Sequence, residues 1–130
     1  MKKFDLPVLL IAFNRPLKFK RLIMGLKLVK PKKIYVFVDG AKTDKDKILC
    51  KKTKNLVKEI NWNCLIIKKY EKTNNGVGVG PYKAISWFFK NEEMGLILED
   101  DCVLKKDFFS FCKNMLLKYK YNNDVGIICG

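Results

Sequence analysis

The sequence contains no histidine, and its only arginines are Arg15 and Arg21. Without histidine, a serine–histidine triad, a histidine general base and a histidine metal ligand are all excluded. Any chemistry must therefore use carboxylates, amides, lysines or a bound metal. The formal net charge is +14, but nearly all of the positive charge is lysine spread along the whole chain. Scarce arginine indicates a compositional bias rather than a surface built to bind nucleic-acid phosphates, so no nucleic-acid partner is expected.

The sequence also lacks a Cys-x-x-Cys pair and a long apolar run. Its five cysteines are an odd set, at Cys50, Cys64, Cys102, Cys112 and Cys129. This pattern argues against a disulfide scaffold and against structural zinc, and it predicts free, buried thiols. The apolar run from Val8 to Phe13 is too short for a signal peptide or a membrane span. We therefore expect a cytoplasmic protein.

Apolar segments of strand length alternate with amphipathic segments along the chain. With 130 residues and 48% hydrophobic content, the chain is expected to form one domain, residues 1–130. The predicted strands are Leu6–Phe13, Ile34–Val38, Cys64–Ile67, Met94–Leu98 and Val125–Cys129. Strands that are apolar throughout are typical of a parallel sheet covered on both faces. The predicted fold class is α/β, a three-layer α/β/α arrangement with a mainly parallel, Rossmann-like sheet.

Each predicted helix has a recognisable start. We expect Asn14 to cap the first helix, Thr43 or Asp44 the second and Asp107 the fourth, with Pro81 as the first residue of the third. The sequence stops on the last predicted strand, without the helix or turn that would close the unit. We therefore expect a truncated chain or half of a longer domain.

Polar residues follow the first four predicted strands. In open α/β sheets, ligands bind at the carboxyl ends of the strands. The residues at these positions are Asn14-Arg15, Asp39-Gly40, Asn74-Asn75-Gly76 and Glu99-Asp100-Asp101. They are the candidate site.

The acidic triplet Glu99-Asp100-Asp101 points to a divalent metal. Three consecutive carboxylates after a buried strand repel one another unless a cation or a hydrogen-bond network compensates. Carboxylate oxygens suit magnesium, manganese or calcium better than zinc or copper. A solvated loop before a helix is the alternative explanation of the triplet.

The other two loops carry weaker signals. Asp39-Gly40 fits a simple turn, or an acceptor for the imide or ribose donor of a nucleotide. The glycines after Asn75 match neither Gly-x-Gly-x-x-Gly nor a P-loop. They nevertheless allow close backbone approach, and the following helix offers free amides to an anion. Lys83 either adds positive charge there or faces solvent.

Four segments together carry a family resemblance: PVLLIAFNRP, IYVFVDGAK, NNGVGVGPYKAISWFF and GLILEDDCVLKKDFFSFC. With these segments in this order, the chain resembles the nucleotide-binding half of GT-A-type glycosyltransferases. The resemblance is to the N-acetylglucosaminyltransferase I group and related bacterial sugar transferases. It spans essentially the whole chain, and the last segment is the most specific.

The resemblance implies a transferase that uses a nucleotide-diphosphate sugar, with UDP as the expected nucleotide. It identifies the triplet with the Asp-x-Asp motif, which makes Asp101 the ligand of Mn²⁺ or Mg²⁺ and places Glu99 and Asp100 against metal-bound water, ribose or donor sugar. The implied acceptor is a saccharide or a lipid-linked molecule. Peripheral association with an anionic membrane surface, at the inner face of the membrane, is a separate expectation. The family's catalytic base and acceptor pocket follow the triplet and have no counterpart here, so the base is expected beyond Gly130.

The remaining site assignments follow from the same resemblance. Asp39 would recognise the base, Asn14 and Arg15 would line the base pocket, and Asn75-Gly76 would lie over the nucleotide, with Lys83 nearby.

Three other functions remain open at the level of sequence. A nucleotidyltransferase would show a basic, glycine-rich loop after the first strand, where Asn14-Arg15-Pro16 stands. A phosphoacceptor domain would need paired acids at that position. A non-enzymatic basic module that binds RNA or an anionic membrane surface is supported by charge alone.

Overall fold

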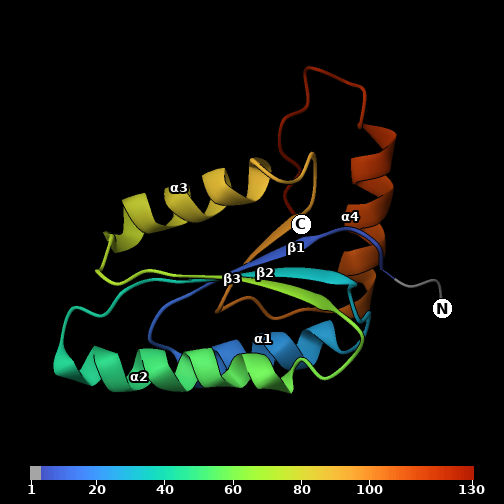
Figure 1. Ribbon diagram of the computed structural model, residues 1–130. Helices are drawn as coiled ribbons and strands as arrows, with labels where there is room; N and C mark the ends of the chain where they lie inside the picture. The colour runs from blue at the N-terminus through green and yellow to red at the C-terminus, as the bar shows by residue number, and fades with distance from the viewer. Residues whose placement is uncertain (1–3) are drawn as a thin grey trace.

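The computed structural model describes residues 4–130, which form a four-stranded, all-parallel sheet with four α-helices (Figure 1). In chain order the elements are β1 (Val8–Ala12), α1 (Pro16–Leu26), β2 (Lys33–Val38), α2 (Asp44–Asn55), the 3₁₀ turn η1 (Leu56–Glu59), β3 (Leu65–Tyr70), α3 (Gly76–Phe89), β4 (Leu96–Glu99) and α4 (Lys106–Lys118). The predicted α/β class and parallel sheet are confirmed.

The strand order is β3-β2-β1-β4, so the chain reverses its direction across the sheet once. It builds outward from β1 to β3 through α1 and α2, and α3 then carries it back to β4 on the other side of β1. Figure 1 shows α1 and α2 below the sheet and α3 above it. This order is that of the first four strands in doubly wound nucleotide-binding sheets, which is compatible with a Rossmann-like fold. The reversal lies between β1 and β4.

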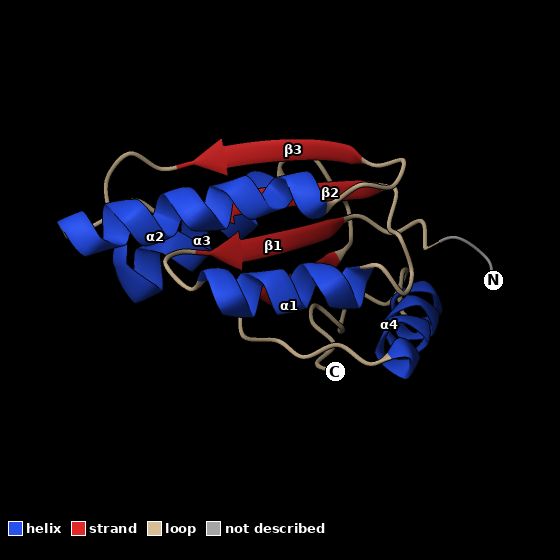
Figure 2. Ribbon diagram, turned by 90° about the horizontal axis from the view of Figure 1, so that it is seen from below, coloured by secondary structure: helices blue, strands red, loops and turns tan. Residues whose placement is uncertain are grey.

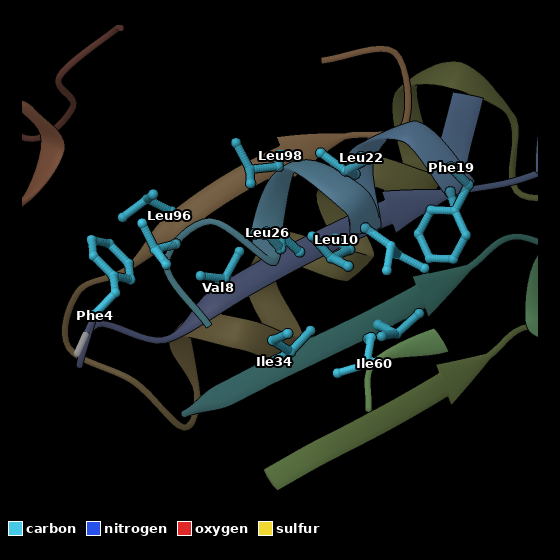
Figure 3. Packing of buried hydrophobic residues seen from close by; sticks show 14 of the residues in the cluster. Phe4, Val8, Leu10, Phe19, Leu22, Leu26, Ile34, Ile60, Leu96 and Leu98 are labelled. Carbon is cyan, nitrogen blue, oxygen red and sulfur yellow. The ribbon is translucent and has the colours of Figure 1, made fainter. Parts of the chain in front are cut away.

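The larger core lies on the face of the sheet that α1 covers. It contains alternate residues of three strands, among them Val8, Ile34 and Leu96, packed against the inner side of α1 (Figure 3). Buried residues of α4 and of the segment before β1 belong to the same cluster, and Phe4 meets Phe109 edge to face at 5.5 Å. Burial of this apolar surface is the main force that holds the helices to the sheet.

The opposite face buries a smaller cluster beneath α3. Leu9, Tyr35 and Phe37 pack there against Ala84 and Phe88. The strands β1 and β2 are buried along nearly their whole length, whereas the residues of β4 alternate between buried and exposed and those of β3 are intermediate or exposed. The expectation of fully covered strands therefore holds for the two central strands and not for the edges.

The predicted fifth strand is wrong. Residues 125–129 lie outside any strand, and Ile127 is 85% exposed while Ile128 lines a small cavity with Leu116 and Tyr119. A short apolar run does not by itself distinguish a strand from a coil that packs one side chain.

Three predicted helix starts also need correction. The first residue of α3 is Gly76, so Pro81 lies inside the helix rather than at its beginning. Arg15, not Asn14, is the N-cap of α1, and Lys105, not Asp107, is the N-cap of α4. Thr43 caps α2 as predicted, with its side chain accepting from the backbone N–H of Asp46.

The five cysteines are free thiols, as predicted, but only Cys50 and Cys112 are fully buried, and Cys129 is exposed. Among residues 4–130, no helix is both long and apolar enough to cross a membrane.

Candidate functional site

A cavity of about 620 Å³ opens at the carboxyl ends of the strands, and we call it the strand-end cavity. Its lining comes from the loops after all four strands and from the first turns of α3. The lining residues are Ile11, Ala12, Phe13, Asn14, Arg15, Phe37, Asp39, Lys42, Asn74, Gly76, Val77, Gly80, Pro81, Glu99 and Asp100. Seven residues predicted from the sequence therefore lie around one space: Asn14, Arg15, Asp39, Asn74, Gly76, Glu99 and Asp100.

The loops after β1 and β4 meet through an ion pair between Arg15 and Asp100. The Arg15 guanidinium donates to both carboxylate oxygens, through Nη2 to Oδ1 and through Nε to Oδ2 at 3.1 Å. Asp100 is held in place by its own backbone, because its N–H continues the β1–β4 ladder to the carbonyl of Ile11 at 3.0 Å. The pair thus lies where the strand order reverses, the place at which open parallel sheets form a ligand crevice.

The two partners differ in exposure. The Asp100 side chain is only 3% exposed, whereas that of Arg15 is 44% exposed. Burial raises the pKa of the Asp100 carboxyl above its ordinary value, and the pairing with Arg15 opposes that shift only in part. The hydrogen bonds to Asp100 in turn raise the pKa of Arg15. Arg15 therefore stays charged, with part of its guanidinium facing solvent.

Asp101, the predicted metal ligand, is exposed beside this pair. Its Oδ2 lies 3.8 Å from Nη1 of Arg15, and Glu99 is also exposed at the end of β4. In the described part of the chain, no three His, Cys, Asp or Glu side chains are grouped as metal ligands. With Asp100 bound to Arg15, the residues fit an ion held by one or two carboxylates together with ligand phosphates, which is how Mg²⁺ is usually bound. They do not fit an ion held by protein ligands alone.

Asp39 ties the loop after β2 to the loop before α3. Its buried carboxylate accepts hydrogen bonds from the N–H of Gly40 at 2.9 Å, the N–H of Asn75 at 3.0 Å and the amide of Asn75 at 2.8 Å. The amide of Asn74 adds a longer bond of 3.3 Å. These donors occupy much of the acceptor capacity of Asp39, so the structure shows it organising the loop as well as lining the cavity.

The loop before α3 brings Asn75 and Lys83 together just outside the cavity lining. Lys83 Nζ donates to Oδ1 of Asn75 at 2.6 Å and lies 3.7 Å from Glu71. The positive φ of 78° at Gly76 allows the chain to turn into α3. Lys83 is thus held near the cavity rather than pointing freely into solvent.

Asn14 is held by a residue that the sequence did not single out. Its amide donates to Oδ1 of Asp46 at 2.8 Å, and the other oxygen of Asp46 accepts from the N–H groups of Lys42 and Thr43. The hydrogen bond from Asn14 is the main reason that the pKa of Asp46 is lowered. A Thr-x-x-Asp spacing resembles a capping box, and that was the available signal for Asp46.

The sequence also missed the apolar part of the lining. Phe13, Val77 and Pro81 line the cavity beside the polar groups, with Phe37 at its buried end. Such a mixture of apolar walls and a few placed polar groups is typical of small-molecule sites. Single apolar residues after a strand or in the first turns of a helix carry no pattern by which they could have been found.

Comparison with known proteins gives no match, whether to a protein-family model, to a curated protein or to a solved structure. Function is therefore inferred from the site itself.

Proposed function

We propose that the strand-end cavity binds the nucleoside diphosphate of a nucleotide sugar, and that the chain is the donor-binding part of a glycosyltransferase with the three-layer GT-A arrangement. The observation that carries this proposal is the convergence of the four loops on one cavity at the point where the strand order reverses. The polar groups suit a nucleotide, and the volume of about 620 Å³ is in the usual range for small-molecule sites.

The two ends of the cavity favour different parts of such a ligand. The apolar residues Phe13, Val77 and Pro81 offer a surface for a base, with the amides of the loop before α3 nearby. Arg15 and Asp101 lie at the β1–β4 side, where the exposed guanidinium offers charged donors to phosphate oxygens. UDP is the nucleotide that we propose, with the sugar phosphates directed toward the acidic triplet.

Transfer of a sugar from such a donor leaves negative charge on the diphosphate, so catalysis requires that charge to be stabilised. Arg15 provides a fixed positive charge, because Asp100 holds its guanidinium in one orientation. Asp101 is the residue that would hold Mn²⁺ or Mg²⁺ together with the diphosphate, and the ion would act there as a Lewis acid. The acceptor, a saccharide or a lipid-linked molecule, would approach from the open side of the cavity.

The test is a calorimetric titration of the protein with UDP in the presence and absence of Mn²⁺. We expect UDP to bind more tightly with Mn²⁺, and Asp101→Ala to remove the effect of the metal. Asp124→Ala, which deletes an exposed carboxylate after α4 and outside the cavity lining, is the matched control and should leave UDP binding unchanged.

Two results would overturn the proposal. One is equal affinity for UDP–Mn²⁺ in the parent and in Asp101→Ala. The other is a lack of binding to UDP, GDP, CDP and dTDP alike when Mn²⁺ is present.

A further inference from the structure

The helix α1 has two apolar sides. Its inner side packs on the sheet through Phe19, Leu22, Ile23 and Leu26, all of them buried. On the opposite side, Leu17, Met24 and Leu28 are 84%, 56% and 48% exposed. These residues and Arg21 follow one another at intervals of four, three and four, so they form a single stripe along the outside of the helix and the turn that ends it. The fold uses the inner side only.

The outer side of α2 continues this surface with basic residues. Asp46, Cys50 and Thr53 are its buried positions, so the residues that face outward include Ile48, Lys51 and Lys52. Ile48 is 60% exposed. Figure 2 shows α1 and α2 side by side on one face of the molecule. In agreement with this view, α1 contacts both α2 and η1. We call the surface formed by Leu17, Arg21, Met24, Leu28, Ile48, Lys51 and Lys52 the outer helical face.

Uncompensated positive charge surrounds the apolar residues of the outer helical face. The helix α1 contains no acidic residue. Asp44 of α2 forms an ion pair with Lys47 at 3.0 Å, and Glu59 of η1 lies 4.0 Å from Lys20. The exposed basic residues on these elements are Lys18, Lys20, Arg21, Lys45, Lys47, Lys51, Lys52 and Lys58.

We propose that the outer helical face docks on the surface of an anionic lipid bilayer. Exposed Leu, Met and Ile side chains among lysines are the pattern of interfacial helices, in which apolar groups enter the headgroup region and basic groups meet anionic lipid. Nucleic acid explains the pattern less well, because α1 and α2 expose no aromatic side chain for base stacking and only one arginine. Apolar residues at the centre of the face would contribute nothing to phosphate contacts.

Docking in this way leaves the strand-end cavity open. The cavity lies at the carboxyl ends of the strands. The outer helical face belongs to α1 and α2, which cover one flat side of the sheet (Figure 1). The helix α1 starts directly after Arg15, so one wall of the cavity would lie next to the lipid headgroups. The docking proposal does not depend on the nucleotide, and its test contains none.

The test is co-sedimentation of the protein with vesicles made of equal parts phosphatidylglycerol and phosphatidylcholine, compared with vesicles of phosphatidylcholine alone. We expect binding to the anionic vesicles only. The variant Arg21→Glu/Lys51→Glu/Lys52→Glu should bind them at least about tenfold more weakly, since each basic residue near the surface adds to the attraction. Within residues 4–130, none of these three side chains forms an ion pair.

The matched control is Lys90→Glu/Lys118→Glu/Lys120→Glu, which changes the net charge equally at exposed positions outside the outer helical face. It should lose less than about threefold in vesicle affinity at a physiological ionic strength of about 0.15 M. A second variant, Met24→Gln/Leu28→Gln, keeps the charge and should release the protein from vesicles at a lower salt concentration than the parent.

Three outcomes would overturn the proposal. The first is that the parent binds neither kind of vesicle. The second is that the control loses as much affinity as the variant of the outer helical face, which would indicate attraction by net charge alone. The third is that single-stranded RNA binds more tightly than vesicles and depends on the same three residues, which would assign the face to nucleic acid.

Discussion

The ion pair between Arg15 and Asp100 joins two loops of the strand-end cavity. Its two members differ in how much the loss of the partner costs in stability. The Asp100 carboxylate is buried, whereas Arg15 is partly solvated. Removing Arg15 therefore leaves a buried charge without its partner, and removing Asp100 leaves an arginine that water can reach. Loss of the partner is therefore more costly for Asp100 than for Arg15.

Arg15→Met should lower the free energy of unfolding by about 1–3 kcal/mol at pH 7. The deficit should shrink as the pH falls toward 4. Burial raises the folded-state pKa of Asp100 above the ordinary value of 3.8. Proton binding by Asp100 therefore stabilises the folded state below pH 3.8, and this stabilisation is lost as the pH rises through the folded-state pKa. Urea unfolding at the two pH values measures both effects.

Two variants control this experiment. Adding Asp100→Asn to Arg15→Met removes the buried charge and should recover much of the loss. Arg21→Met removes an exposed arginine and should change stability by less than about 0.5 kcal/mol. A deficit of equal size at pH 7 and pH 4 would contradict the account.

Gly80→Ala tests the role of Asp39 in shaping the cavity. A methyl group at Gly80 would lie 3.1 Å from Oδ2 of Asp39, and the hydrogen bonds to that carboxylate resist its movement. We expect an affinity for UDP about tenfold lower, equivalent to about 1.4 kcal/mol, measured by calorimetry.

Gly78→Ala is the control for this prediction. It lies in the same helix, and a methyl group there would meet nothing within 4 Å. It should leave UDP binding unchanged and raise stability by about 0.5–1 kcal/mol, because alanine loses less backbone entropy in a helix. Equal effects of the two substitutions on UDP affinity would show that Asp39 has no part in binding.

At the scale of the element, the start of α2 connects the helix to the cavity. Thr43 and Asp46 form a reciprocal capping box, and Asp46 also accepts from Asn14 at the end of β1. One carboxylate therefore stabilises a helix and orients a residue of the cavity wall.

Asp46→Asn should reduce the acid sensitivity of the protein. The lowered folded-state pKa of Asp46 means that its contribution to stability is present above the ordinary value of 3.8 and is lost as pH falls through the lower folded value. The parent should thus lose more thermal stability than the variant between pH 5 and pH 3, as measured by circular dichroism. Thr43→Ala is the comparison: it should cost about 1 kcal/mol at pH 5. Its loss of stability on acidification should lie between those of the parent and Asp46→Asn, because the Thr43 hydroxyl is a smaller cause of the lowered pKa of Asp46. Parallel curves for the parent and Asp46→Asn would contradict the prediction.

Local patterns in the sequence predicted the four strands of the sheet and the Thr43 cap, because apolar runs and capping residues act over a few positions. They did not predict the hydrogen-bond partner of the Asn14 side chain, because Asp46 is 32 residues away in the sequence. The same patterns misplaced the start of α3, since Pro81 at a first helical position is common but a glycine-rich first turn was also allowed. Residue types at strand ends identified polar members of the site, whereas Phe13 and Val77 depended on how the loops fold together.

At the scale of the whole molecule, the single reversal in strand order places Arg15 and Asp101 on adjacent loops although they are far apart in the chain. A metal at this point would have too few protein ligands to bind tightly alone, because Asp100 is engaged by Arg15. The nucleotide would supply the missing oxygens. Binding of the two should therefore be coupled, each raising the affinity of the other by the same factor.

Thermal unfolding should reveal this coupling. Mn²⁺ alone should leave the melting temperature of the protein nearly unchanged, UDP alone should raise it slightly, and both together should raise it by more than the sum. A ligand at about 100 times its Kd stabilises the folded state by about 2.7 kcal/mol, which is well within the range of the measurement. In Asp101→Ala the two ligands should become additive, while Asp124→Ala should behave as the parent. A large shift with Mn²⁺ alone would instead indicate a metal site made of protein ligands, and it would remove the reason for assigning the ion to the diphosphate.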